Sequence, residues 1–452
     1  MKSRESSKYS RDSSKPSIGL FSLQSERTSS QNKEISTKKC KLIFKIFLLI
    51  LCLGIIIYLF IDYKRFNDLF QNNIYLNIIN NYDSIIFWAK IIDYLSNYHI
   101  FVFLFILGFC QWNIYKSFIH FYGFFICEYI VFSLKLIFRK QPIILTLDFN
   151  KNDLSSESLK LLCEFTSEYE CPSYRSVYVI YSYMSFITLL FKEKKLKNNK
   201  ITKIILRIIF IIISLAINAS LILLLQSSIC SIIIGTAIGF IIYFFMFNLL
   251  KIDYDRSEQM LAFLNTNIFI YIFINIIFFC VIFLLNIFVE PKDEEIENFN
   301  NLCGNTYYNY KKLNSETFFK SLFFYCNLIM IISIKLQRKL IFKQDGYFVS
   351  RNFYVNEIIE QNNLLSRITN EETYKFNKIV FIKYMCKVFI CLGIALVVYL
   401  MFVIIKYYRG EYYTILSIIA YFLPINLLVI FLFLFSKILF IHLDLEIYND
   451  YE

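Results

Sequence analysis

The residues best suited to chemistry lie in one polar stretch, Glu168–Ser176, which directly precedes a hydrophobic segment. It places Arg175 beside two hydroxyl side chains, Ser173 and Ser176. A guanidinium is planar and offers paired donors that fit a phosphate or a carboxylate. The same group stays protonated in proteins, so Arg175 cannot act as a nucleophile. The stretch therefore indicates anion binding, with a polar turn before a membrane helix as the alternative.

A second candidate for anion binding is Lys135, which ends the run Cys127–Lys135 and precedes the basic patch Arg139-Lys140-Gln141-Pro142. An ammonium acts on a phosphate as a compact point charge. Taken alone, Lys135 and Arg139 are more typical of side chains that snorkel from the end of a membrane span.

Composition excludes an ordinary soluble protein. The chain has 452 residues, is 57% hydrophobic and 19% aromatic, and has a mean hydropathy of +0.52. Its formal net charge of +12 comes mainly from basic residues that flank apolar segments, which the positive-inside rule explains better than nucleic-acid binding does. Most of the 12 cysteines lie inside apolar runs, and the three histidines form no cluster with metal-ligand spacing. We expect membrane lipids as partners, and neither a metal nor another cofactor.

The apolar segments predict an all-α, polytopic membrane protein. Each segment is near the length that a bilayer requires. About ten transmembrane helices are expected, at residues 43–61, 99–115, 117–138, 176–191, 204–225, 229–250, 266–289, 317–335, 379–405 and 413–441. Residues 1–40 are polar and rich in Ser and Lys, which predicts a disordered basic tail on the cytosolic side.

The charge pattern also predicts which loops share a face of the membrane. With a cytosolic tail, ten crossings place the Lys-rich loop 192–203 in the cytosol as well. The same parity places three stretches together on the opposite face: 139–175, 226–228 and 290–316. A site assembled from several loops requires such a shared face.

Three cysteines fall on this non-cytosolic face: Cys163, Cys171 and Cys303. In the oxidising lumen of the endoplasmic reticulum, a Cys163–Cys171 disulfide would pin the turn at Pro172 and Ser173. Three free thiols are the alternative.

The polar stretch resembles the second motif of the type-2 phosphatidic acid phosphatase superfamily, Pro-Ser-x-His. In the sphingosine-1-phosphate and long-chain-base-phosphate phosphatases this motif is similar to Glu-Tyr-Gly-x-Pro-Ser-x-His-Ser, and five positions match it here: Glu168, Tyr169, Pro172, Ser173 and Ser176. Arg175 stands where the family has histidine. The first family motif is Lys, six residues, then Arg-Pro. Lys135 matches its lysine, but Pro142 and Ile143 stand at the Arg-Pro pair.

The third family motif is matched only in part. Its pattern is Ser-Arg, five residues, His, three residues, Asp, and Gly four residues later. Placing the glycine on Gly235 aligns the serine with Ser220, but the other key positions hold Leu221, Ser227 and Ser231. Gly235 and Gly239 form a G-x-x-x-G pattern, which by itself indicates close helix packing.

The resemblance implies a loss of catalysis. In the family, one histidine attacks phosphorus, the other protonates the leaving alkoxide, and Lys and Arg hold the phosphate oxygens. Neither histidine has a working counterpart here, because Arg175 stays protonated and Ser227 cannot titrate near neutral pH. What remains is a set of phosphate-binding candidates without catalytic residues: Lys135, Ser173, Arg175, Ser220 and Ser227.

The resemblance covers about residues 90–250 and implies a lipid-phosphatase-like core of six helices at 41–255, followed by a four-helix extension at 256–452. Glucose-6-phosphatases are a second match in architecture. The resemblance implies an inactive protein of the endoplasmic reticulum or another endomembrane that binds a lipid phosphate or a protein partner. One alternative is an active lipid phosphate phosphatase with a different nucleophile. Another is an unrelated transporter or channel, against which the few ionisable residues within the spans argue.

Overall fold

The computed structural model describes residues 44–93, 105–147, 169–191, 200–249, 267–288, 325–337 and 370–445, with short gaps inside these ranges, and a few residues between them. The chain divides into two compact units, Met1–Gly54 and Ile55–Glu452. The predicted tail at 1–40 lies outside the described residues. All described elements are helices, and no strand occurs among them, as predicted.

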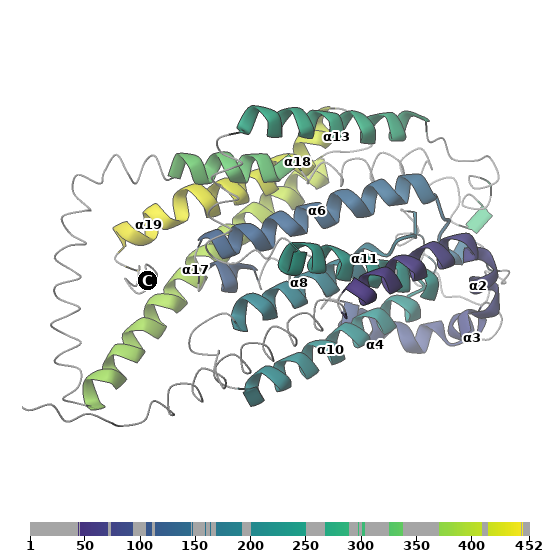
Figure 1. Cartoon of the computed structure of the whole chain (residues 1–452), viewed down its shortest axis with the longest axis horizontal. Coiled ribbons are helices and arrows are strands. Elements are labelled where there is room, and N and C mark those ends of the chain that lie inside the picture. Colours follow the sequence, from purple (N-terminus) through teal and green to yellow (C-terminus); the bar gives the residue numbers. More distant parts are fainter. Residues whose placement is uncertain are drawn as a thin grey trace, which may run out of the picture. The chain divides into compact units, whose positions relative to one another are not determined.

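The second unit contains a succession of helices (Figure 1). In chain order these are α2 Tyr63–Phe70, α3 Leu76–Asn80, α4 Tyr82–Asp93, α6 Ile114–Phe138, α8 Tyr174–Phe191, α10 Lys200–Leu223, α11 Ile229–Phe244, α13 Ile268–Phe288, α17 Asn370–Tyr408, α18 Ile415–Ile430 and α19 Ser436–His442. A 3₁₀ helix, Ile143–Leu145, follows α6, and π-helical turns at Phe245–Leu249 and Phe431–Phe435 follow α11 and α18. Long apolar runs fold this way because a helix satisfies its own backbone hydrogen bonds without water.

Five helices in the described part of the chain are long and apolar enough to cross a membrane: Ser117–Leu145, Ile201–Leu223, Ile229–Phe247, Ile268–Leu285 and Phe381–Met401. A sixth is added if Ile46–Ile61 and Tyr63–Phe70, which meet at 81°, count as one bent span. The helices are compatible with a multi-pass integral membrane protein. The expected count of ten is not confirmed. Two shorter apolar helices, Cys326–Gln337 and Leu423–Phe435, cover only part of two predicted spans, and the predicted spans at 99–115 and 176–191 are not among the helices that are long and apolar enough.

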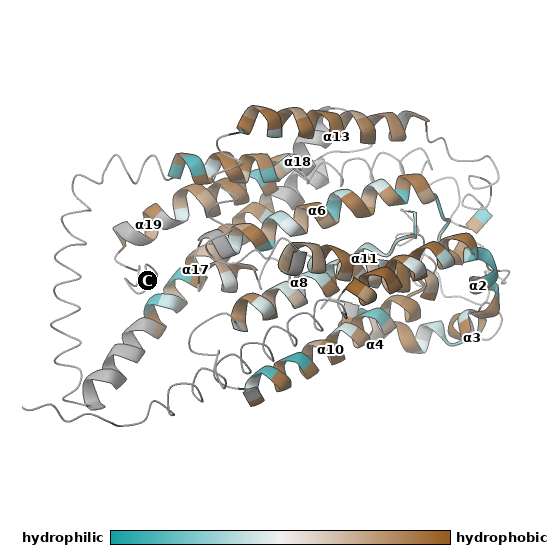
Figure 2. Cartoon of the chain, in the orientation of Figure 1, coloured by the Kyte–Doolittle hydropathy of each residue, from teal (hydrophilic) through white to brown (hydrophobic). Residues whose placement is uncertain are grey.

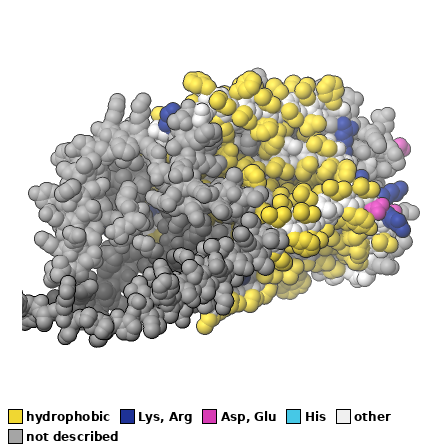
Figure 3. Space-filling model, in the orientation of Figure 1, with side chains coloured by type: hydrophobic (Ala, Val, Ile, Leu, Met, Phe, Trp, Pro, Cys, Tyr) yellow, Lys and Arg dark blue, Asp and Glu magenta, His cyan; other side chains and the backbone are white. Residues whose placement is uncertain are grey.

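The outer helices expose apolar side chains. Phe269 of α13 is 83% exposed and Ile201 of α10 is 71% exposed. Figure 2 shows these two helices as largely hydrophobic. Figure 3 shows hydrophobic side chains over much of the described part of one face, with most of the visible charged side chains at one end. Such a surface fits contact with lipid tails better than contact with water.

Inside this apolar layer, α8 packs closely against α11 through glycine. A Cβ atom at Gly235 would lie 2.6 Å from the carbonyl oxygen of Ser173, and one at Gly239 would lie 2.7 Å from that of Val177. Both distances are too short for a side chain, so only glycine permits this approach. The G-x-x-x-G pattern therefore marks close helix packing, as predicted.

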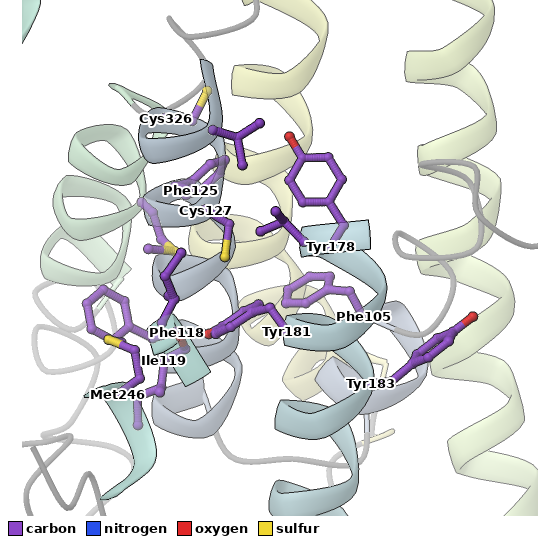
Figure 4. Close-up of a cluster of buried hydrophobic side chains, with 14 of the residues drawn as sticks. Phe105, Phe118, Ile119, Phe125, Cys127, Tyr178, Tyr181, Tyr183, Met246 and Cys326 are labelled. Atoms are coloured by element: carbon purple, nitrogen blue, oxygen red, sulfur yellow. Dashed lines mark hydrogen bonds between the residues drawn. The ribbon is translucent and has the colours of Figure 1, made fainter. Parts of the chain in front are cut away.

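The core between α6 and α8 is aromatic but not wholly apolar (Figure 4). The Tyr181 hydroxyl donates to the carbonyl of His120 over 3.2 Å, and Gly123 leaves room for the Tyr181 ring. His120 Nδ1 lies 2.6 Å from Ser185 Oγ, and both side chains are buried. Interhelical hydrogen bonds of this kind join helices where the hydrophobic effect cannot distinguish protein from lipid. The sequence predicted no role for His120.

The close approach of α8 and α11 can be tested by adding one methyl group. Gly235→Ala is expected to lower the free energy of unfolding by about 1–3 kcal/mol, because the new Cβ meets backbone that cannot move cheaply. Gly393→Ala in α17 is the matched control, since nothing lies within 4 Å of its Cβ position. Thermal unfolding in detergent should show loss for the first variant and no loss for the second. Equal stability of both variants would contradict the packing.

Candidate functional site

The candidate site begins with the loop that leads into α8. Its backbone is bonded to the start of α11: Ser173 N donates to the Ser231 carbonyl over 3.2 Å, and Ser231 Oγ donates to the Glu170 carbonyl over 2.8 Å. Ser228 caps α11 by accepting from Ser231 N at 3.2 Å. These bonds hold the polar stretch against the turn between α10 and α11 and the start of α11, 54 to 61 residues away in the chain.

A cluster of hydroxyl groups forms where the two segments meet. Ser173 Oγ lies 3.1 Å from Ser227 Oγ and 3.1 Å from Ser176 Oγ. Ser176 Oγ also lies 2.8 Å from Asn218 Oδ1 of α10. Ser173 and Ser227 are both buried, and both were candidates from the sequence. The structure thus brings two predicted residues into direct contact.

Two cationic side chains lie around the ring of Tyr174. Lys135 Nζ of α6 is 4.8 Å from the ring centroid, within cation–π range. Arg175 Cζ is 5.6 Å from the same centroid, and its Nε donates to the Tyr174 hydroxyl over 2.9 Å. Lys135 is only 2% exposed, whereas Arg175 is half-buried. Lys135 and Arg175 therefore both lie against the ring of Tyr174, the residue that follows Ser173 in the chain.

Glu170 is the buried acidic group of the site. Its Oε1 accepts from the Ser228 N–H, and from the Tyr63 hydroxyl over 3.3 Å. Tyr63 Oη also lies 3.0 Å from Ser228 Oγ, and Glu170 N donates to the Lys140 carbonyl over 3.0 Å. Burial raises the pKa of Glu170 to about 7, although the hydrogen bonds from Ser228, Ile143 and Tyr63 act in the opposite direction.

A second hydrophobic cluster covers the turn between α10 and α11. It contains the 3₁₀ helix Ile143–Leu145, the α3 residues Ile78 and Ile79, and the flanking Tyr75 and Tyr82. The Tyr75 hydroxyl accepts from Ile229 N over 2.9 Å. Leu225 in this turn has a φ of 53°, an unfavourable value for a leucine that the surrounding contacts maintain. The turn that carries Ser227 is thus held from both sides.

Two features predicted from the sequence, a binding role for Ser220 and the Cys163–Cys171 disulfide, are not part of the site. Ser220 is buried, but its hydroxyl donates to the Ile217 carbonyl over 2.7 Å, so it is used within α10. The predicted Cys163–Cys171 disulfide is wrong, because Cys171 is a free, buried thiol. The physical reason is that the two cysteines belong to different hydrophobic clusters: Cys171 faces the α11 side, whereas Cys163 packs in the second cluster. Cys163 is disulfide-bonded, but to another cysteine.

Sequence reasoning missed the roles of Glu170 and Tyr63. Glu170 lies inside the polar stretch, but its position is glycine in the motif that the stretch resembles. The resemblance therefore predicted no role for it. Tyr63 is 107 residues away in the chain, and no local pattern links the two. No family model, curated protein or solved structure matches this chain.

The buried carboxyl makes stability depend on pH. The ordinary glutamate pKa is 4.5 and the folded value is about 7, so the folded state binds the proton more tightly. The stabilisation from this group is fully present below about pH 4.5 and is lost as the pH rises through about 7. It amounts to about 3 kcal/mol at most.

Wild-type protein is therefore expected to lose thermal stability between about pH 5.5 and about pH 8. Glu170→Gln should lose clearly less over the same range, because it cannot ionise. Thermal unfolding across this range, with both proteins in the same detergent, gives the comparison. Parallel curves for the two proteins would show that Glu170 does not titrate in this interval.

Proposed function

We propose that this end of the helices binds a phosphate-bearing lipid and does not hydrolyse it. The observation that carries the proposal is the placement of Lys135 and Arg175, from two different helices, around one tyrosine ring beside Ser173. A phosphate would receive paired hydrogen bonds from the guanidinium and a second charge from the ammonium. The Ser173 and Ser227 hydroxyls, which contact each other next to Tyr174 in the chain, are further neutral donors for such a ligand.

A lipid is the favoured ligand because of where these groups lie. Lys135 is in the last turn of α6, at the end of a long apolar run, which is the depth at which headgroup phosphates occur. The apolar side chains exposed on α10 and α13 provide a surface for hydrocarbon. A soluble phosphate could reach the same groups, so the two ligand sources must be compared directly.

The chemistry of the described hydroxyl, guanidinium and imidazole groups supports binding without hydrolysis. Arg175 stays protonated, and the hydroxyl of Ser227 is a poor acid near neutral pH. His120, the histidine whose side chain the structure describes, is bonded to Ser185 rather than to the Ser173 cluster. Ser173 itself contacts the hydroxyls of Ser176 and Ser227, which cannot act as a base for it.

The phosphatase resemblance is retained as part of this proposal. Its three motifs lie on α6, on α8 and around the α10–α11 turn, and residues from all three meet at Tyr174 and Ser173. Convergence of three separate stretches supports a common origin with the sphingosine-1-phosphate phosphatases. The same convergence supports the expected six-helix core with an added extension.

The compartment can also be proposed from one covalent bond. Cys163 is disulfide-bonded, and disulfides persist mainly in oxidising compartments. This supports placing the site in the lumen of the endoplasmic reticulum or a related endomembrane, with the amino terminus in the cytosol. The Lys-rich loop at 192–203 then lies on the cytosolic side, as the charge rule requires.

Transport is a second candidate function, because ionisable and amide side chains are buried within the apolar helices. His120 and Glu128 of α6 and Lys387 of α17 are each less than 5% exposed. Such groups commonly mark ion or substrate pathways in membrane proteins. These buried groups weaken the sequence argument against a transporter, which relied on the small number of ionisable residues within the spans.

Arg175→Ala is expected to weaken binding of a labelled long-chain-base phosphate by about 1–3 kcal/mol, the usual range for removing a charged hydrogen-bond partner. Arg175→Lys should recover only part of the loss, because the planar fork is missing. Lys203→Ala, in the first turn of α10, is the matched control and should bind like wild type. Binding is measured in detergent, with phosphate release followed in the same samples.

Three outcomes would contradict the proposal. Equal binding by wild type and Arg175→Ala would remove the guanidinium from the site. No binding by wild type would leave the polar cluster as a structural feature only. Phosphate release above background, if it is abolished by Ser173→Ala, would instead identify an active enzyme.

A further inference from the structure

Glu170 is placed where its charge must affect any anion bound nearby. It precedes Ser173 by three residues, and its carboxyl is fully buried against Ser228 and Tyr63. Its charge acts on the Lys135 ammonium, together with that of Arg175. A buried charge is poorly screened, so its effect on the site is stronger than that of a surface carboxylate.

The titratable and charged groups around Glu170 come from every neighbouring element. They are Tyr63 of α2, Tyr75 before α3, Lys135 of α6, Lys140 after α6, Cys171 of the loop and Cys230 of α11. The two lysines are the basic groups of this set. Neither tyrosine nor cysteine carries a charge at neutral pH in its ordinary state. Among these described groups, Glu170 is the carboxyl, so it is the one whose ionisation adds negative charge.

We propose that Glu170 is a proton-dependent regulator of the anion site, so that binding of a lipid phosphate is coupled to uptake of one proton by its carboxyl. The inference rests on the proposed function, since it requires an anion between Lys135 and Arg175. A bound phosphate adds negative charge beside Glu170, which favours the neutral carboxyl. By linkage, protonation of Glu170 strengthens phosphate binding by the same factor.

The hydrogen bonds explain why Glu170 can change its charge without disrupting the fold. The Ser228 N–H can donate to a neutral carboxyl as well as to a carboxylate. The pKa of Glu170, about 7 because of burial, places the change within the physiological range. The affinity therefore falls as the pH rises through about 7, since ionised Glu170 opposes the incoming phosphate.

The test compares wild type with Glu170→Gln, using the full chain in detergent and a long-chain-base phosphate as the probe. A phosphate monoester also titrates near pH 6, but this effect is common to both proteins and cancels in the ratio of their dissociation constants. At about pH 5.5 the two proteins should bind alike. At about pH 8 the glutamine variant should bind about fivefold tighter or more, at the lower end of usual coupling factors.

Two further variants sharpen the assignment. Asp68→Asn on the exposed face of α2 removes a carboxylate by the same chemistry and should keep the wild-type pH dependence. Tyr63→Phe removes a hydrogen bond that lowers the pKa of Glu170. In this variant the affinity for the lipid phosphate should therefore fall at a higher pH than in wild type. Inorganic phosphate in a parallel titration separates a free anion from a lipid headgroup.

The outcomes distinguish this inference from the proposed function. Binding by wild type with a ratio to Glu170→Gln that does not change with pH would overturn the proton coupling and leave lipid-phosphate binding intact. The same pH-dependent ratio for Asp68→Asn would assign the effect to net charge and overturn it as well. No binding of either phosphate by wild type would overturn both proposals.

Discussion

The close approach of α8 and α11 is the constraint on which the rest of the site depends. Gly235 and Gly239 let the α11 backbone lie against the carbonyls of Ser173 and Val177, where any side chain would collide. This contact fixes the position of the loop before α8, along the helix axis, relative to the α10–α11 turn. The Ser173–Ser231 backbone bond and the Ser173–Ser227 hydroxyl contact both follow from it. A site made of two distant segments is thus positioned by helix packing rather than by either loop alone.

The second constraint is the cost of placing charge in an apolar environment. Lys135 lies against the Tyr174 ring, and Glu170 accepts from Ser228 and Tyr63. Each charged group therefore has a polar or aromatic neighbour that reduces the cost of its burial. The arrangement leaves Arg175 half-buried and hydroxyls adjacent to it. The phosphate that we propose as ligand would add negative charge beside these two cationic side chains.

Some of this site could be predicted from the sequence because it depends on short patterns. The G-x-x-x-G spacing predicted the helix contact, and motif order predicted that Lys135, Ser173 and Ser227 belong together. The partners of Glu170 could not be predicted, since Tyr63 and Ser228 reach it from distant helices. The wrong prediction of a Cys163–Cys171 disulfide has the same cause. The predicted topology placed both thiols on one face of the membrane, but it could not show that they belong to different hydrophobic clusters. Hydropathy likewise counts apolar runs without showing bends such as the 81° one after Ile61.

The central claim is that the start of α8 meets the α10–α11 turn, and a cross-link tests it most directly. In a Cys171→Ala background, Ser173→Cys combined with Ser227→Cys should form a disulfide on mild oxidation, since the two hydroxyl oxygens lie 3.1 Å apart. Ser173→Cys combined with Ser182→Cys is the control and should not cross-link, because about two and a half turns of α8 separate them. Mass spectrometry identifies the bonded peptides. Formation of the first bond without loss of thermal stability is the expected result. Its absence, under conditions where both thiols react with a small maleimide, would contradict the account.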